Sequence, residues 1–173
     1  MLGVSNARLN AAHMTPNYVA LLFAVYDAGL RQMIVANAGA PRPILMRGAK
    51  IQEVKIEGTP VGMFPGIEYE TITLALEPDD IIVFASDGIL ETMNAEDQSF
   101  GFDRLAGVLR NLAPGSSAEN ISAAILDATD EFSGRPMEAH DDRTLIILRL
   151  TGNRAGKQAG NAACASKSWQ INP

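Results

Sequence analysis

Two acidic segments stand out in the sequence, each where an apolar run meets a loop. Only Ser86 separates the run 81–85 from Asp87, and only Arg143 separates Asp141 and Asp142 from the run 144–150. If the two runs are neighbouring strands of one sheet, their acids converge on one rim. Carboxylates that converge repel one another and raise each other's pKa unless a cation binds between them. Oxygen ligands alone favour Mg²⁺ or Mn²⁺ over zinc.

Each of these residues also has a plainer interpretation. Asp87 is of a type that commonly caps helices, and it would cap a short helix beginning at Ile89. His140 and His13 have no local partner pattern and are interpreted as solvated loop residues. The adjacent acids 79–80 follow Pro78 and are interpreted as turn formers.

Composition bounds the class of protein. The chain has 173 residues, 47% hydrophobic and 20% charged, which is typical of one soluble domain. No apolar run approaches the ~20 residues of a membrane span, and no signal-peptide pattern opens the chain, so we expect a cytoplasmic protein. Cys164 is the single cysteine, which excludes a disulfide or a cysteine-based metal site within the chain.

Charge is unevenly distributed. Residues 152–173 hold three basic residues and no acid, so the net charge of −6 divides into +3 there and −9 over residues 1–151. The acidic body argues against a nucleic-acid surface and is compatible with divalent cations, although surplus acids are more often only solvated. The segment 152–173 has no hydrophobic period and is predicted to be a disordered basic tail after a domain at 1–151.

The first half of the chain predicts strands. Residues 1–16 show neither a clear strand nor a well-capped helix, whereas the apolar runs 18–26 and 32–37 around a turn predict a hairpin. The length of the first run suggests a strand covered on both faces. Short strands are expected at 43–47 and 51–54.

The second half mixes strands and helices. Alternation at 70–76 predicts a half-buried strand, which we expect to pair with the strand beginning at Ile81. Apolar residues at helical spacing predict one helix over 102–112 and a second, opened by a capping box at 116–119, ending near Gly134. A strand is expected at 144–150.

Ordered landmarks in this sequence resemble a known family, the metal-dependent protein serine/threonine phosphatases of PPM type, in their RsbU/SpoIIE-like bacterial branch. The resemblance covers residues 9–150, and matches in order are more specific than any single motif. The matching elements are Asn37-Ala38-Gly39 with following prolines ("NAGHPP"), Val61-Gly62 ("PLG"), Leu76 to Asp80 ("LEPGD"), Ser86-Asp87-Gly88-Ile89 with Glu91 and Asn94 ("TDGVTEARN"), Phe100-Gly101 with Arg104-Leu105 ("FGxERL") and Asp141 to Thr144 ("DDxT").

The resemblance implies a fold and a chemistry. The fold would be an α+β sandwich of the α-β-β-α type, with two mainly antiparallel sheets flanked by helices. Two Mn²⁺ or Mg²⁺ ions would activate a water that attacks phosphoserine or phosphothreonine, and the substrate would be a phosphorylated anti-sigma-factor antagonist. Asp87 and Asp141 match metal ligands and are the catalytic candidates. Supporting candidates are Gly88, Asp142, Asn37 and Gly39.

The sequence also departs from the family pattern. Ala40 stands where the branch has histidine, and no "GDVxGxG" element, which gives the family its metal-bridging aspartate, precedes Tyr18. We therefore expect an N-terminally incomplete domain that has uncovered sheet edges. The alternative to an enzyme is a catalytically silent fragment or binding module of the same fold.

Overall fold

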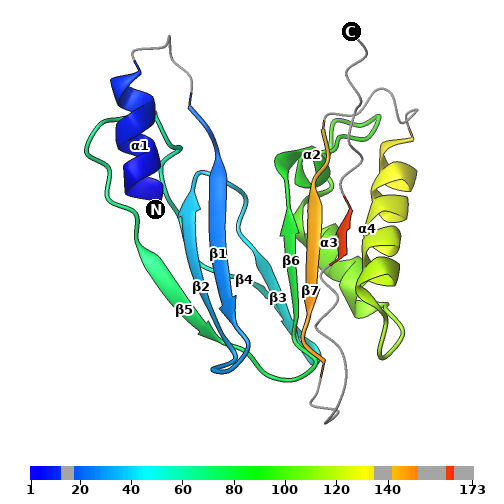
Figure 1. The fold of residues 1–173 in the computed structure, drawn as a ribbon. Coiled ribbons are helices and arrows are strands. Elements are labelled where there is room, and N and C mark those ends of the chain that lie inside the picture. The colour runs from blue at the N-terminus through cyan, green and yellow to red at the C-terminus, as the bar shows by residue number, and fades with distance from the viewer. Residues whose placement is uncertain (13–17, 135–141, 152–162, 166–173) are drawn as a thin grey trace, which may run out of the picture. The chain divides into compact units, whose positions relative to one another are not determined.

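The computed structural model describes residues 1–12, 18–134, 142–151 and 163–165. The chain divides into two compact units, Met1–Arg42 with Glu53–Glu77 and Pro43–Gln52 with Pro78–Pro173. Each unit contains one antiparallel sheet and at least one helix (Figure 1). The predicted class, a mixed α/β protein with two antiparallel sheets and helices, is confirmed.

The first unit is built on a three-stranded sheet of order β1-β2-β5. Its strands are β1 (Leu21–Asp27), β2 (Gln32–Ala38) and β5 (Thr71–Ala75). The predicted hairpin is confirmed as β1 and β2, which pair antiparallel. The Asp27 carboxylate closes its turn by accepting the backbone N–H groups of Gly29 and Leu30 at 2.8 and 2.9 Å.

Helix α1 (Leu2–Ala11) occupies the segment in which the sequence shows no element. It has no acid in its first turn and no side-chain cap, so the usual local signals are missing. Long-range contacts hold it instead. The buried Asn6 side chain accepts the N–H of Gly62 at 2.8 Å and donates to the Phe64 carbonyl at 3.0 Å.

Strand β1 corrects a second expectation. Its run of apolar residues suggested cover on both faces, but β1 lies at the edge of its sheet with Leu21 and Val25 38% and 49% exposed. Val25 is paired with Ile34 of β2, which is 47% exposed. Helix α1 packs near Ala36 and Ala38 instead, so the sheet face that carries Val25 and Ile34 is only partly covered in the described chain.

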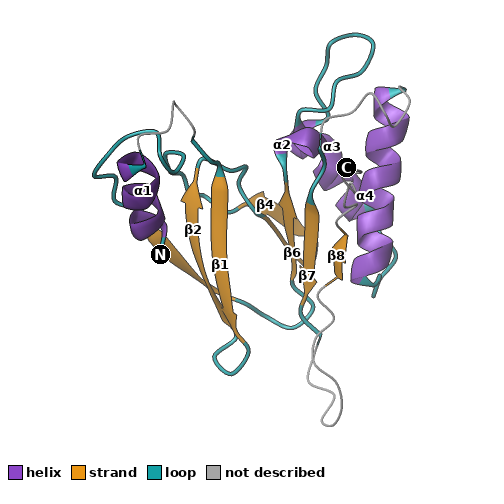
Figure 2. Ribbon diagram, turned by 45° about the horizontal axis from the view of Figure 1, so that its top comes forward, coloured by secondary structure: helices purple, strands orange, loops and turns teal. Residues whose placement is uncertain are grey.

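The second unit is built on a five-stranded sheet of order β4-β3-β6-β7-β8. Helices α3 and α4 pack together on one face of this sheet, with the core between them and the strands (Figure 2). Residues Ile89, Leu105, Ile121, Ile125 and Ile147 are among the fully buried members of that core. The strands are β3 (Ile44–Arg47), β4 (Lys50–Glu53), β6 (Ile81–Ala85), β7 (Leu145–Arg149) and β8 (Ala163–Ala165), and the helices are α2 (Asp87–Leu90), α3 (Gly101–Arg110) and α4 (Ala118–Ser133).

Most predicted elements of this unit are confirmed, and two details change. The N-cap of α4 is Ser117 rather than Ser116, since the Ser117 hydroxyl accepts the N–H of Asn120 at 3.2 Å. Strand β8 lies in the segment predicted to have no regular structure, and the rest of 152–173 lies outside the described residues. None of the helices in the described ranges is long and apolar enough to cross a membrane.

The expected pairing of β5 with β6 is wrong. Strand β5 pairs with β2, while β6 lies between β3 and β7 in the other sheet. The turn between them is held by the end of β7, because the backbone N–H of Asp79 donates to the Leu150 carbonyl at 2.7 Å and the backbone N–H of Leu150 donates to the Asp80 carbonyl at 2.9 Å. A short turn after an alternating strand therefore does not close a hairpin here.

Asp80 is more than a turn former. Its side chain is 1% exposed and forms a two-point ion pair with Arg47, in which Nε donates to Oδ1 at 2.9 Å and Nη2 to Oδ2 at 2.6 Å. Asp79 beside it has a positive φ of 69° and a 72% exposed side chain paired with Arg149 at 3.1 Å. The two adjacent acids therefore differ in burial, and only one anchors the sheet.

Replacing each of the two aspartates in turn by asparagine tests this difference. We expect Asp80→Asn to lower the free energy of unfolding by about 2 kcal/mol, because the half-exposed Arg47 loses a buried charged partner. Asp79→Asn should change it by less than about 0.5 kcal/mol, since surface pairs contribute little and asparagine tolerates positive φ. Urea unfolding followed by circular dichroism measures both, and equal effects would contradict the distinction.

Gly88 marks the closest packing of the second unit. A Cβ at this position would lie 2.3 Å from the carbonyl oxygen and 3.0 Å from the carbonyl carbon of Asp142, both backbone atoms. The residue is buried, and its backbone conformation is helical, as part of α2. Glycine is needed here for close approach rather than for an unusual backbone angle.

Substitution of Gly88 and Gly107, which both lie in helices, separates the effect of close packing from that of backbone conformation. Gly88→Ala should lower the free energy of unfolding by about 3 kcal/mol, because backbone atoms cannot move aside cheaply. In Gly107→Ala of α3 a new Cβ meets nothing within 4 Å, so we expect a gain of about 0.5 kcal/mol from helix propensity. Thermal unfolding of both variants is the measurement, and a neutral Gly88→Ala would refute the close contact.

Candidate functional site

Asp87 lies where strand β6 ends, as the first residue of α2. Its side chain is exposed, and Oδ1 accepts the N–H of Gly88 at 2.9 Å. The N-cap of α2 is Ser86, so the interpretation of Asp87 as the cap of a helix starting at Ile89 is wrong. Because the carboxylate is in water, its charge does not need a buried partner to compensate desolvation.

The second acidic segment lies beside the first. Strands β6 and β7 pair antiparallel with Ala85 opposite Leu145, so the end of one and the start of the other share a sheet edge. The neighbouring-strand expectation is thereby confirmed, and the Asp142 backbone rests on Gly88. Asp141, like the neighbouring His140, and His13 lie outside the described residues.

Three residues that the sequence analysis did not assign hold this segment in place. The Ser86 hydroxyl accepts the N–H of Thr144 at 2.9 Å. Arg143, whose side chain is 11% exposed, donates from Nη1 to Oδ1 of Asp130 on α4 at 2.6 Å. Asp130 carries no local signal for this role, because its partner belongs to a different element.

The donor chemistry of the rim suits a hard divalent cation. Carboxylate oxygens are the preferred ligands of Mg²⁺ and Mn²⁺, and Asp87 forms no ion pair with any residue in the described ranges. Within the part of the chain that the structure describes, no three His, Cys, Asp or Glu side chains gather as a metal-binding group.

Asn37 and Gly39 belong to the first unit and shape a turn there. The buried Asn37 amide donates to the carbonyls of Ala40 and Ile56 at 2.9 and 3.2 Å and accepts the N–H of Ala40 at 2.9 Å. Gly39 has φ 82°, and a Cβ there would collide with the Pro60 ring at 2.5 Å. These contacts give both residues a structural task in fixing the loop after β2.

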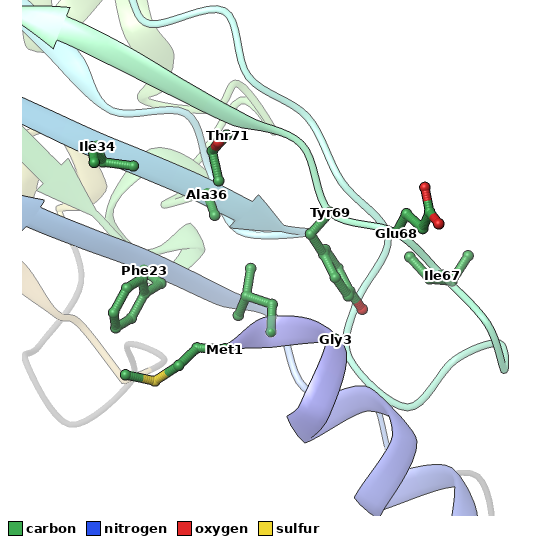
Figure 3. A pocket seen from close by; sticks show the side chains of 10 residues that line it. Met1, Gly3, Phe23, Ile34, Ala36, Ile67, Glu68, Tyr69 and Thr71 are labelled. Carbon is green, nitrogen blue, oxygen red and sulfur yellow. The ribbon is translucent and has the colours of Figure 1, made fainter.

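The first unit also contains a cavity of about 470 Å³. Figure 3 shows its lining side chains, which come from α1, from the sheet and from the segment before β5. The lining is mostly apolar, and its one acid, Glu68, lies outside the motifs that resemble the phosphatase family. The acidic rim of the second unit, rather than this cavity, is therefore the candidate site.

Comparison with solved structures shows the fold. The chain is similar to the SiaA PP2C domain of Pseudomonas aeruginosa, with 22% identity and a TM-score of 0.70 over 86% of this chain and 59% of that one. It is also similar to the PP2C phosphatase domain, with a fragment of the regulatory domain, of the cell fate determinant SpoIIE from Bacillus subtilis, with 18% identity and a TM-score of 0.71 over 86% and 43%. PppA of P. aeruginosa, a regulatory component of its T6SS, aligns at 16% identity and a TM-score of 0.61 over 86% and 67%.

These matches cover only part of the related structures. The chain spans 59% of the SpoIIE phosphatase-domain structure that was presoaked with Mn. No curated protein sequence matches the chain. The family model of stage II sporulation protein E (SpoIIE) matches residues 2–151, which is most of the sequence. The resemblance carried by the motifs is thereby confirmed, and the chain belongs to the SpoIIE family.

Proposed function

We propose that this protein is a PP2C-type serine/threonine phosphatase that hydrolyses phosphoserine or phosphothreonine in other proteins. The observation that carries the proposal is the junction of β6 and β7, where Asp87 and the Asp142 segment meet at one end of a sheet in a chain of the SpoIIE family. An acid at the end of a rigid strand is held more precisely than one on a free loop.

Asp87 and Asp141 are the proposed metal ligands, and Mn²⁺ or Mg²⁺ the proposed cofactor. Two such ions, when bound, would lower the pKa of an attacking water and neutralise charge on the phosphoryl group. Asp87 would supply a full negative charge with one oxygen already oriented by the Gly88 N–H. Asp142 would support the site through its backbone, which packs on Gly88.

The proposed substrate is a phosphorylated anti-sigma-factor antagonist in the bacterial cytoplasm. Support comes from the family, since the motifs are those of the RsbU/SpoIIE-like branch and the family model is that of SpoIIE. The charge of −9 over residues 1–151 speaks against a nucleic-acid partner, which would be repelled.

A second function is a binding module that keeps the fold without catalysis. Two observations favour it: Ala40 replaces the histidine of the branch motif, and the described residues gather no group of three metal-binding side chains. Both functions predict a folded domain. They differ in whether the binding of divalent cations and the hydrolysis of phosphate esters depend on Asp87.

Substitution of Asp87 tests its role. We expect Asp87→Asn to weaken the binding of Mn²⁺ by about tenfold or more, because the amide keeps the shape of the side chain but supplies no charge. Unfolding without metal should change little. Asp103→Asn is the matched control, since Asp103 is an exposed acid in the first turn of α3. Isothermal titration with MnCl₂ measures both, and equal affinities for Asp87→Asn and the unsubstituted chain would contradict the assignment.

The chain of 173 residues by itself should bind divalent cations weakly and hydrolyse phosphoserine peptides negligibly. Asp87 and Asp141 supply two carboxylates, whereas Mg²⁺ requires near-octahedral coordination and gives up its water reluctantly. Phosphate release with MnCl₂ or MgCl₂ is the measurement. Robust Mn²⁺-dependent turnover would overturn this expectation and would mean that acids such as Asp142 or Glu91 complete the site.

A further inference from the structure

The hydroxyl of Ser86 has an unusual task for a serine at a helix N-cap. Such side chains normally accept an N–H from the first turn of their own helix, but Ser86 makes no side-chain cap hydrogen bond to α2. Its Oγ accepts the N–H of Thr144 instead, at 2.9 Å. Thr144 lies 58 positions later in the chain. The side chain is thus committed to the segment before β7 rather than to its own helix.

The reason lies in the geometry of the β6–β7 ladder. Residues facing each other in an antiparallel hydrogen-bonded pair exchange two N–H···O=C bonds. Ser86 makes one of them, since its N–H donates to the Thr144 carbonyl at 2.9 Å. The return bond from Thr144 cannot use the Ser86 carbonyl in the usual way, because that carbonyl accepts the N–H groups of Ile89 and Leu90 at 3.1 and 3.3 Å.

The hydroxyl replaces the missing acceptor. Strand β6 can therefore turn into α2, and so present Asp87, while the ladder to Thr144 still closes with two hydrogen bonds. Thr144 is separated from Asp142 by one residue, and the Asp142 backbone is the one that rests on Gly88. The hydroxyl thus restrains residues 142–144 at Thr144, and Gly88 restrains them at Asp142.

We propose that Ser86 is a positioning residue, whose hydroxyl fixes the register of residues 142–144 against Asp87 and thereby sets the affinity of the rim for divalent cations. This inference rests on the proposed function. Alanine at position 86 removes the acceptor and leaves the Thr144 N–H without its partner. Threonine keeps a hydroxyl on the same carbon and should replace serine.

The test uses the full chain, uniformly labelled with ¹⁵N, in the unsubstituted form and as Ser86→Ala, Ser86→Thr and Ser117→Ala. Ser117 is the matched control, because its hydroxyl also accepts one backbone N–H at the start of a helix, that of Asn120. MnCl₂ is added, and paramagnetic broadening of the amide signals of Asp87, Gly88 and Asp142 is followed. Hydrogen exchange of the Thr144 amide and the midpoint of thermal unfolding are recorded for each variant.

We expect Ser86→Ala to raise the Mn²⁺ concentration for half-broadening by about tenfold, the scale of losing a group that orients a metal ligand, and to speed exchange of the Thr144 amide. Ser86→Thr should behave like the unsubstituted chain. Ser117→Ala should lower the unfolding midpoint without changing the response to Mn²⁺, which separates positioning from general stability.

Two other results overturn the proposals in distinguishable ways. If Mn²⁺ broadens the rim signals of the unsubstituted chain and of Ser86→Ala at the same concentration, Ser86 has no positioning role, and the metal site stands. If millimolar Mn²⁺ broadens none of these signals in the unsubstituted chain, the metal site is wrong and the role of Ser86 toward it falls as well.

Discussion

The antiparallel pairing of β6 with β7 is the interaction on which the candidate site depends. The acids it brings together are more than 50 residues apart in the chain. Closing so long a connection costs conformational entropy, which the buried strand pair offsets, since Val83 and Ile147 face each other and both are almost fully buried. The rim acids themselves contribute little to this stability. They are carried to the sheet edge by strands that are stable for other reasons.

The junction at the end of β6 combines three requirements in consecutive residues. Ser86 must end the β6–β7 ladder and still provide an acceptor for the N–H of Thr144. Asp87 must remain in water, and Gly88 must allow the Asp142 backbone to approach. A side chain without a hydroxyl at position 86, an apolar side chain at position 87 or any Cβ at position 88 would fail one of these requirements. This explains in physical terms why a hydroxyl, an acid and a glycine follow one another here.

Local patterns predicted a good part of the fold. Alternation and apolar runs identified the strands β2, β5 and β7, and helical spacing identified α3 and α4. The predictions that were wrong concern partners. Strand β5 pairs in a different sheet from β6, β1 is an exposed edge, and α1 is held by Asn6 across a distance in sequence that no local window includes. Asp80 likewise looks like a turn residue until Arg47 is placed beside it.

The sequence by itself determined the kinds of groups available: the acids at strand ends, the ordered motifs that led to the SpoIIE family, and the residues that must be buried. These follow from residue type and short-range spacing, which are properties of the chain alone. The tertiary structure decided which strands are neighbours, that Asp87 begins a helix whose N-cap position is Ser86, and that the Ser86 hydroxyl is used across the sheet. Strand neighbours depend on packing between segments that are distant in the sequence. The Ser86 hydroxyl is used across the sheet because the N–H groups of Ile89 and Leu90 occupy the Ser86 carbonyl, which leaves the Thr144 N–H to the hydroxyl once the strands have paired.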